Sequence, residues 1–95
     1  MKPLTREWIG KAEGDLATVR REVQARKAPN YDAACFHAQQ CIEKYLKARL
    51  QEAEISFAVG VRYPGESADK AMAREALALC HDVRRHIRLS LGLEL

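Results

Sequence analysis

Residues 37–48, HAQQCIEKYLKA, decide the fold of this chain. Ala38, Cys41, Ile42 and Tyr45 recur at the spacing of one helical face. The pattern continues on both sides and predicts a helix from about residue 31 to residue 54. Because apolar residues cover much of its circumference, we expect this helix to be the central element and to pack on more than one side.

Two further helices are expected around it, from about residue 5 to 26 and from about residue 68 to 91. In each, apolar residues step by three or four along one face, as in a helical bundle. The first stripe contains Trp8, Ala12, Leu16, Val19 and Val23. The second contains Ala73, Ala76, Cys80, Val83, Ile87 and Leu91.

The expected helix ends are marked by residues that suit capping. Thr5, Asn30 and Ser67 are candidate N-caps, and Gly92 is suited to close the last helix. Residues 55–61 resemble a strand in composition but have no partner strand, so we interpret them as a connection. The sequence therefore predicts an all-α fold, an up-and-down antiparallel bundle of three long helices, in one domain over residues 1–95.

The composition excludes several classes of protein. With 47% hydrophobic and 31% charged residues, the chain is expected to be globular, and 6% aromatics with few Gly and Pro argue against an all-β fold. A net charge of +3 is compatible with nucleic-acid binding but does not by itself indicate it. No signal-peptide pattern and no apolar run of membrane-spanning length is present. We therefore expect a cytoplasmic protein with no membrane association.

The small size and the three cysteines lead to two more expectations. A chain of 95 residues buries a modest core, so a homodimer formed through the central helix is expected to help stability. Cys35, Cys41 and Cys80 have no metal-ligand spacing and fall within helical patterns, which predicts buried free thiols in a reducing compartment.

Three segments together resemble a known family. They are Trp8 with Ala12 and Asp15-Leu16, the run YDAACFHAQQCIEKYLKA over residues 31–48, and VRYPG over residues 61–65. They are similar to the HEPN family, whose name stands for higher eukaryotes and prokaryotes nucleotide-binding. The resemblance extends over nearly the whole chain and is most specific in the central helix. Family members usually have a further loop and helix before the Arg-Tyr-Pro turn, so this chain resembles a shortened member.

The resemblance implies a dimeric all-α bundle with more helices than three. Small prokaryotic members are often encoded beside a minimal nucleotidyltransferase, and such pairs can act as toxin and antitoxin. Many members are metal-independent ribonucleases with an Arg-x(4–6)-His motif assembled from two protomers, and others bind nucleotides or act as scaffolds. We therefore expect a module that binds a nucleotide or RNA phosphate and pairs with a nucleotidyltransferase. An endoribonuclease toxin and a dimerisation module without ligand remain alternatives, and no cofactor is expected.

Arg74 and His81 are the candidate catalytic residues, because REALALCH fits Arg-x6-His. They fall on nearly the same face of one helix, roughly 10 Å apart along its axis, so Arg74 of one chain would approach His81 of another in a two-fold dimer. His suits general acid–base catalysis near neutral pH and Arg stabilises phosphate charge. The alternative is that both are ordinary surface residues, and Glu75 next to Arg74 would repel phosphate.

A polar stripe on the central helix is the candidate phosphate site. His37, Gln40, Lys44 and Lys47 are spaced by 3, 4 and 3, and Glu43 and Lys47 form an i,i+4 pair. With Arg62 and Tyr63 from the following turn, the stripe predicts a positive pocket formed by Gln40, Lys44, Lys47, Arg62 and Tyr63. The simpler alternative is a solvated helix face.

Three other features have structural explanations. His81 and His86, with Asp82 nearby, are not aligned as metal ligands, so no metal site is expected. Arg84-Arg85-His86 and Arg88 lie near a helix C-terminus, where they complement the helix dipole or contact an anion. Trp8, on an apolar stripe, is expected to be core.

Overall fold

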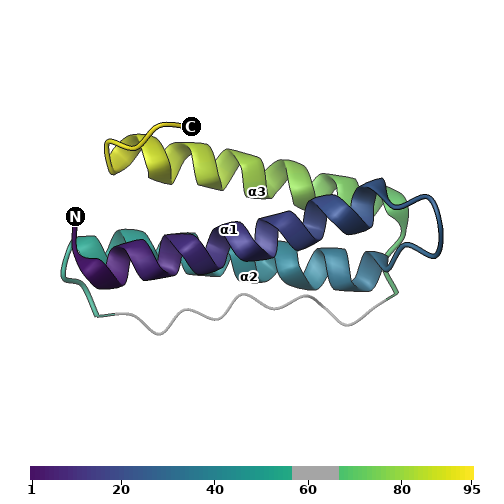
Figure 1. Cartoon of the computed structure of the whole chain (residues 1–95), viewed down its shortest axis with the longest axis horizontal. Helices are drawn as coiled ribbons and strands as arrows, with labels where there is room; N and C mark the ends of the chain where they lie inside the picture. Colours follow the sequence, from purple (N-terminus) through teal and green to yellow (C-terminus); the bar gives the residue numbers. More distant parts are fainter. Residues whose placement is uncertain (57–66) are drawn as a thin grey trace.

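The computed structural model describes residues 1–56 and 67–95. Its three helices are α1 (Pro3–Gln24), α2 (Tyr31–Glu52) and α3 (Lys70–Ser90), and the described residues contain no strand. Figure 1 shows the helices lying side by side along the long axis of the molecule. The prediction of an all-α bundle of three long helices is confirmed. None of these helices is long and apolar enough to cross a membrane.

α1 and α2 run in opposite directions, as expected. Near the start of α1, Thr5 Oγ1 donates a hydrogen bond to Glu52 Oε1 at the end of α2, at 3.0 Å. At the other end, the backbone N–H of Asn30 donates to Glu22 Oε1 at 2.9 Å. These contacts fix the two helices in register at both ends of their shared length.

α3 runs parallel to α2 and therefore departs from a strict up-and-down order (Figure 1). Three contacts follow one another in the same order along both helices. Asp32 accepts from the backbone of Ala68, the Cys80 thiol donates to Ala38 O at 3.1 Å, and Arg88 reaches Tyr45 Oη at 3.5 Å. Both other helices are thus antiparallel to α1.

The length of the connection explains this difference. Short connections place consecutive helices antiparallel, and we expected one here. Residues 53–69 separate α2 from α3, and a chain of that length, fully extended, spans up to about 55 Å. A 22-residue helix is about 33 Å long. The chain can therefore return to the starting end of α2 before α3 begins.

Two of the three predicted N-caps are wrong. Asn30 caps α2 as predicted, with its side chain accepting from the backbone of Ala33. Thr5 lies inside α1 and is buried, because α1 begins at Pro3; proline at a first helical position has no backbone donor to satisfy. α3 is capped by Asp69, and not by Ser67. Gly92 has a φ of +74° and closes α3, as predicted.

The core is built mainly from small side chains. α2 faces its neighbours with alanine and cysteine, and Tyr45, Leu16 and Val19 are among the largest fully buried residues. The predicted stripes of α1 and α3 face this core, although Trp8 is only half-buried at its edge. Phe36, expected among the apolar residues of α2, is 50% exposed.

All three cysteines are buried free thiols, as predicted. Cys41 and Cys80 are fully buried where α2 meets α3. A hydrogen bond to Cys80 and burial both raise the pKa of the Cys41 thiol well above its usual value. This thiol therefore stays protonated and acts as a small core group.

Candidate functional site

The polar stripe of α2 lies against α1 and is only partly exposed to solvent. Its residues are His37, Gln40, Lys44 and Lys47. Asp15 of α1 lies against it and is only 8% exposed. Asp15 Oδ1 is 2.7 Å from His37 Nδ1, and Asp15 Oδ2 is 2.5 Å from Lys44 Nζ. The buried carboxylate thus has a basic partner at each oxygen, which is the arrangement that a buried charge requires.

Lys47 has two neighbours of its own. Its Nζ is 3.0 Å from Glu43 Oε1, which confirms the predicted i,i+4 pair. The same ammonium lies 5.0 Å from the centroid of the Trp8 ring, and the ammonium of Lys11 lies 5.6 Å from it. Both distances are within the range of cation–π attraction.

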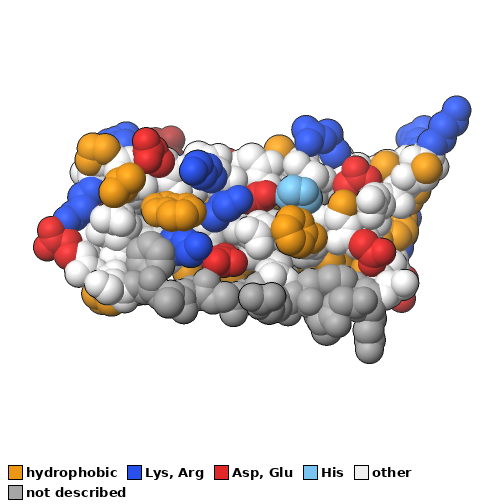
Figure 2. All heavy atoms as spheres, turned by 90° about the horizontal axis from the view of Figure 1, so that it is seen from below, with side chains coloured by type: hydrophobic (Ala, Val, Ile, Leu, Met, Phe, Trp, Pro, Cys, Tyr) orange, Lys and Arg blue, Asp and Glu red, His pale blue; other side chains and the backbone are white. Residues whose placement is uncertain are grey.

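The predicted phosphate pocket is therefore only partly assembled in the described structure. Gln40, Lys44 and Lys47 share one face of α2 and are half-buried, but both ammonium groups already contact carboxylates. Arg62 and Tyr63 lie outside the described residues. Figure 2 views the molecule from the side opposite α3, and on that face basic, acidic and hydrophobic side chains are interspersed.

A second polar cluster joins all three helices where α1 meets α3. Glu13 Oε2 accepts from Arg84 Nε at 2.8 Å, and Glu13 Oε1 lies 3.2 Å from the other donating nitrogen of Arg84. Tyr45, fully buried in α2, donates its hydroxyl to Glu13 Oε2, and Arg88 reaches the same hydroxyl. One carboxylate thereby holds a residue from each of the other helices.

The pKa values in this cluster follow from these contacts. Burial by itself would raise the pKa of Glu13, but hydrogen bonds from Arg84 and Tyr45 outweigh it and lower the pKa below 4.5. Burial and the hydrogen bond to Glu13 raise the pKa of Tyr45 to about 12. Glu13 is therefore ionised and Tyr45 neutral at physiological pH.

Arg74 and His81 are both exposed on α3. Within residues 1–56 and 67–95, neither side chain forms a hydrogen bond or an ion pair. Partial burial and the positive charges of Arg20 and Arg84 lower the pKa of His81 below 6.5, against opposing effects of Asp82 and Glu13. The imidazole of His81 is therefore mostly neutral at pH 7, with arginines close enough to act on it.

This arrangement suits a phosphate group. Guanidinium groups bind phosphate oxygens through paired hydrogen bonds, and a neutral imidazole both donates and accepts a proton. We call Arg20, Arg74 and His81 the α1–α3 rim. The sequence predicted two of its members and missed Arg20, because no spacing within α1 reveals which helix will pack beside it.

Glu13 and Asp15 were not predicted as site-forming residues either. They stand on either side of the apolar stripe of α1, next to Ala12 and Leu16. Acidic residues that border an apolar stripe lie at the seam with the neighbouring helix, where they meet basic residues across it. The position relative to the stripe was the available signal.

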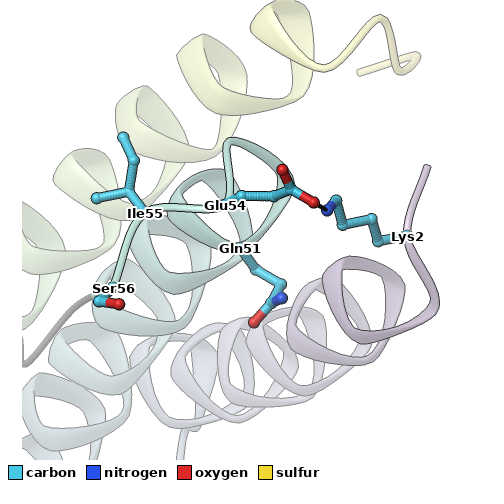
Figure 3. A pocket seen from close by; sticks show the side chains of 5 residues that line it. All are labelled: Lys2, Gln51, Glu54, Ile55 and Ser56. Carbon is cyan, nitrogen blue, oxygen red and sulfur yellow. Dashed lines mark hydrogen bonds and ion pairs between the residues drawn. The ribbon is translucent and has the colours of Figure 1, made fainter.

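A pocket of about 300 Å³ lies at one end of the bundle and is lined by Lys2, Gln51, Glu54, Ile55 and Ser56. Figure 3 shows the Lys2 ammonium directed at the carboxylate of Glu54, with which it forms an ion pair. The one basic group of this lining is thus neutralised, which disfavours an anion. Among the described residues, no group of three or more His, Cys, Asp or Glu side chains is placed to hold a metal ion.

Comparison with known protein families identifies a matching domain family. The sequence model of the HEPN domain matches residues 5–60, which is more than half of the chain and contains most of α1, all of α2 and the quoted stretch. The α2 stripe lies inside the match, whereas Arg74 and His81 lie beyond its end. No curated protein and no solved structure matches the chain.

Proposed function

Because the chain belongs to the HEPN family, we propose that it is a helical module that binds the phosphate groups of a nucleotide or RNA at the exposed basic side of α3. The observation that carries the proposal is the pair of exposed residues Arg74 and His81, with a further arginine of α1 acting electrostatically on His81. Phosphate contacts of this kind supply most of the non-specific affinity for nucleic acids.

The balance of charge favours α3 over the α2 stripe. Lys44 and Lys47 each contact a carboxylate, so a phosphate there would have to displace Asp15 or Glu43. Displacing Asp15 from Lys44 would leave a buried carboxylate with His37 as its remaining partner, which is costly. Arg74 and His81 require no such displacement within the described part of the chain.

Binding is tested by titrating ATP, GTP and a fluorescent single-stranded RNA into the protein at low salt. We expect saturable binding that weakens as salt rises and that Arg74→Ala and His81→Ala reduce severalfold. Lys11→Ala, which removes one exposed positive charge from α1 near Trp8, is the matched control and should leave binding nearly unchanged. No binding by the unaltered chain at high micromolar concentration would overturn the proposal.

A second candidate function is metal-independent RNA cleavage, and the lowered pKa of His81 favours it. A neutral imidazole can accept the proton of an RNA 2′-hydroxyl as its oxygen attacks the adjacent phosphorus. The new P–O2′ bond replaces the P–O5′ bond, which leaves a 2′,3′-cyclic phosphate and a 5′-hydroxyl that takes up a proton. Arg74 of the other chain in a two-fold dimer would stabilise the negative charge that develops on the phosphate oxygens.

Cleavage is tested with end-labelled RNA in the presence of EDTA. Products bearing a cyclic phosphate, absent with His81→Ala and Arg74→Ala, would establish the activity. Intact RNA, in a preparation that binds it, would leave a binding module without catalysis. This result separates the two candidate functions in one sample.

The partner and the assembly are proposals that rest on the family resemblance. We propose a minimal nucleotidyltransferase as protein partner, in a toxin–antitoxin-like pair, and a homodimer as the assembly. Co-expression with a nucleotidyltransferase encoded beside this chain should give a complex that survives gel filtration. Sedimentation should give twice the mass of one chain. A dimer that binds neither nucleotide, RNA nor partner would instead be a plain dimerisation module.

A further inference from the structure

The register of α1 against α3 is fixed at two places. Glu13 is bonded to Arg84, and one turn earlier in α1, Ile9 lines a common pocket with Arg88. As the residue number falls by four in α1, it rises by four in α3. The two helices are therefore antiparallel and directly adjacent over this length.

This register places Arg20 along α3. Arg20 follows Glu13 by seven residues, which is about two turns, and so lies on nearly the same side of α1. Two turns back from Arg84 in the antiparallel helix is Leu77. Leu77 lies three residues after Arg74 and four before His81, so Arg20 lies at a level between them.

The lowered pKa of the His81 imidazole agrees with this placement. The guanidinium of Arg20 is among the groups that act on the imidazole, together with Arg84, Asp82 and Glu13. Arg20 is exposed and, within the described residues, forms no ion pair of its own. It is thus available to a ligand at the same place as His81.

We infer that Arg20 of α1 supplies, within a single chain, the arginine that works with His81 to hold an RNA phosphate, so that the α1–α3 rim is an RNA backbone track. The inference rests on the proposed phosphate-binding function and deepens it. Arg74 and His81 alone are roughly 10 Å apart along α3 and cannot both contact one phosphate. Arg20 fills the interval between them, and the three basic groups then follow one another along the seam.

The placement is tested first without ligand. The pKa of His81 is measured by NMR titration of its imidazole in the unaltered chain, in Arg20→Gln and in Arg21→Gln. Arg21 is the matched control, because it lies about 100° around α1 from Arg20 and its guanidinium bonds to Thr18 Oγ1 at 3.1 Å. Removing the positive charge of Arg20 should raise the pKa of His81 toward its ordinary value, and Arg21→Gln should not. An unchanged pKa in Arg20→Gln would overturn the placement.

Binding is tested next with a fluorescent single-stranded oligouridylate. We expect Arg20→Gln to weaken binding about fivefold and to reduce the slope of log K against log salt by about 1, as for the loss of one phosphate contact. Arg21→Gln should weaken binding far less. Equal losses in the two variants would overturn the inference and leave the proposed function standing. No binding by the unaltered chain would overturn both.

A mixing experiment decides whether one chain is sufficient. Arg20→Gln and His81→Gln are each impaired when alone, and they are then combined in equal amounts after denaturation and refolding together. If both residues act within one chain, the mixture binds no better than the average of the two variants. Recovery of binding in the mixture would mean that the site is shared between two copies, and would overturn the single-chain assignment.

Discussion

The two seams of α1 use charge in opposite ways. On the α2 side, Lys44 contacts Asp15 of α1, and Lys47 contacts Glu43 of its own helix. Against α3, a single carboxylate, Glu13, is enclosed by Arg84 and Tyr45, while further basic groups remain exposed beside it. The lysines on the α2 side are thus neutralised by carboxylates, whereas basic groups on the α3 side remain without an acidic partner among the described residues.

The difference separates structural from ligand-binding roles for similar residues. A lysine that compensates a buried carboxylate contributes to folding and loses that contribution if a phosphate takes it away. An exposed arginine that compensates no buried carboxylate can bind an anion without a loss of folding stability. The four predictions below test the two seams against each other.

Asp15→Ala should have the largest effect. The side chain is almost fully buried and has two basic partners, and breaking a buried pair of this kind costs about 3 kcal/mol or more of unfolding free energy. Urea unfolding measured by circular dichroism gives the value. Glu7→Ala, at an exposed position of the same helix, should stay within about 0.5 kcal/mol. A loss for Asp15→Ala no larger than that of the control would mean that the α1–α2 seam is not closed by these ion pairs.

Glu13→Gln should have a smaller effect that depends on pH. The pKa of Glu13 is lowered in the folded chain, so its ionised form stabilises the fold above the unfolded pKa, and this stability is lost as the pH falls through the folded pKa. Because its side chain is 35% exposed, solvent screens the interaction. Near pH 7 we expect a loss of about 1 kcal/mol, measured by urea unfolding.

The pH dependence makes the Glu13 result specific. As the pH falls through the lowered pKa of Glu13 in the folded chain, the difference between Glu13→Gln and the unaltered chain should shrink. A difference that is equally large in acid would contradict an electrostatic role for Glu13 and would indicate a packing defect. The comparison also shows whether the α1–α3 seam tolerates loss of its one enclosed carboxylate better than the α1–α2 seam does.

The sequence was sufficient for the helices because the stripes of α1 and α3 are regular and the apolar girth of α2 is wide. It was not sufficient for the direction of α3. Periodicity reports which residues of a helix are buried, but the direction of the helix depends on what the connection can span, and that length was interpreted as a short return. The same limit explains the two errors in the N-caps. Residue type alone does not show where a helix begins, and α1 begins at Pro3, before Thr5, while α3 is capped by Asp69 and not by Ser67.

The candidate site was predictable only where it lies within one helix. Arg74 and His81, or Lys44 and Lys47, are related by spacing alone. Asp15 beside His37, and Arg20 beside His81, depend on how α1 is rotated and aligned against its neighbours. The contacts of Asp15 change the interpretation of the α2 stripe, because His37 and Lys44 compensate a buried carboxylate and do not simply face solvent.

Gly14→Ala should stabilise the chain without changing either seam. A Cβ added at Gly14 would meet no described atom within 4 Å, so the substitution should add about 1 kcal/mol of unfolding free energy through helix propensity. Gly92→Ala is the matched opposite, because Gly92 has a φ of +74°, where alanine is strained by about 1 kcal/mol. Thermal unfolding should shift upward for the first variant and downward for the second. A downward shift for Gly14→Ala would show that α1 is approached there by something outside the described residues, such as a second copy.

The smallest expected effect concerns Lys47 and distinguishes the two candidate phosphate sites. Lys47→Met removes an i,i+4 ion pair and a cation–π contact with Trp8, together worth about 0.5–1 kcal/mol, and should alter the emission of the single tryptophan. That emission then reports on ligand binding in the unaltered chain. If RNA binds along the α1–α3 rim, saturating RNA should leave Trp8 emission nearly unchanged, because the ammonium of Lys47 keeps its place over the ring. A large change in emission that is absent in Lys47→Met would instead assign the phosphate to Gln40, Lys44 and Lys47, and would mean that a ligand can open the seam that Asp15 and Glu43 close.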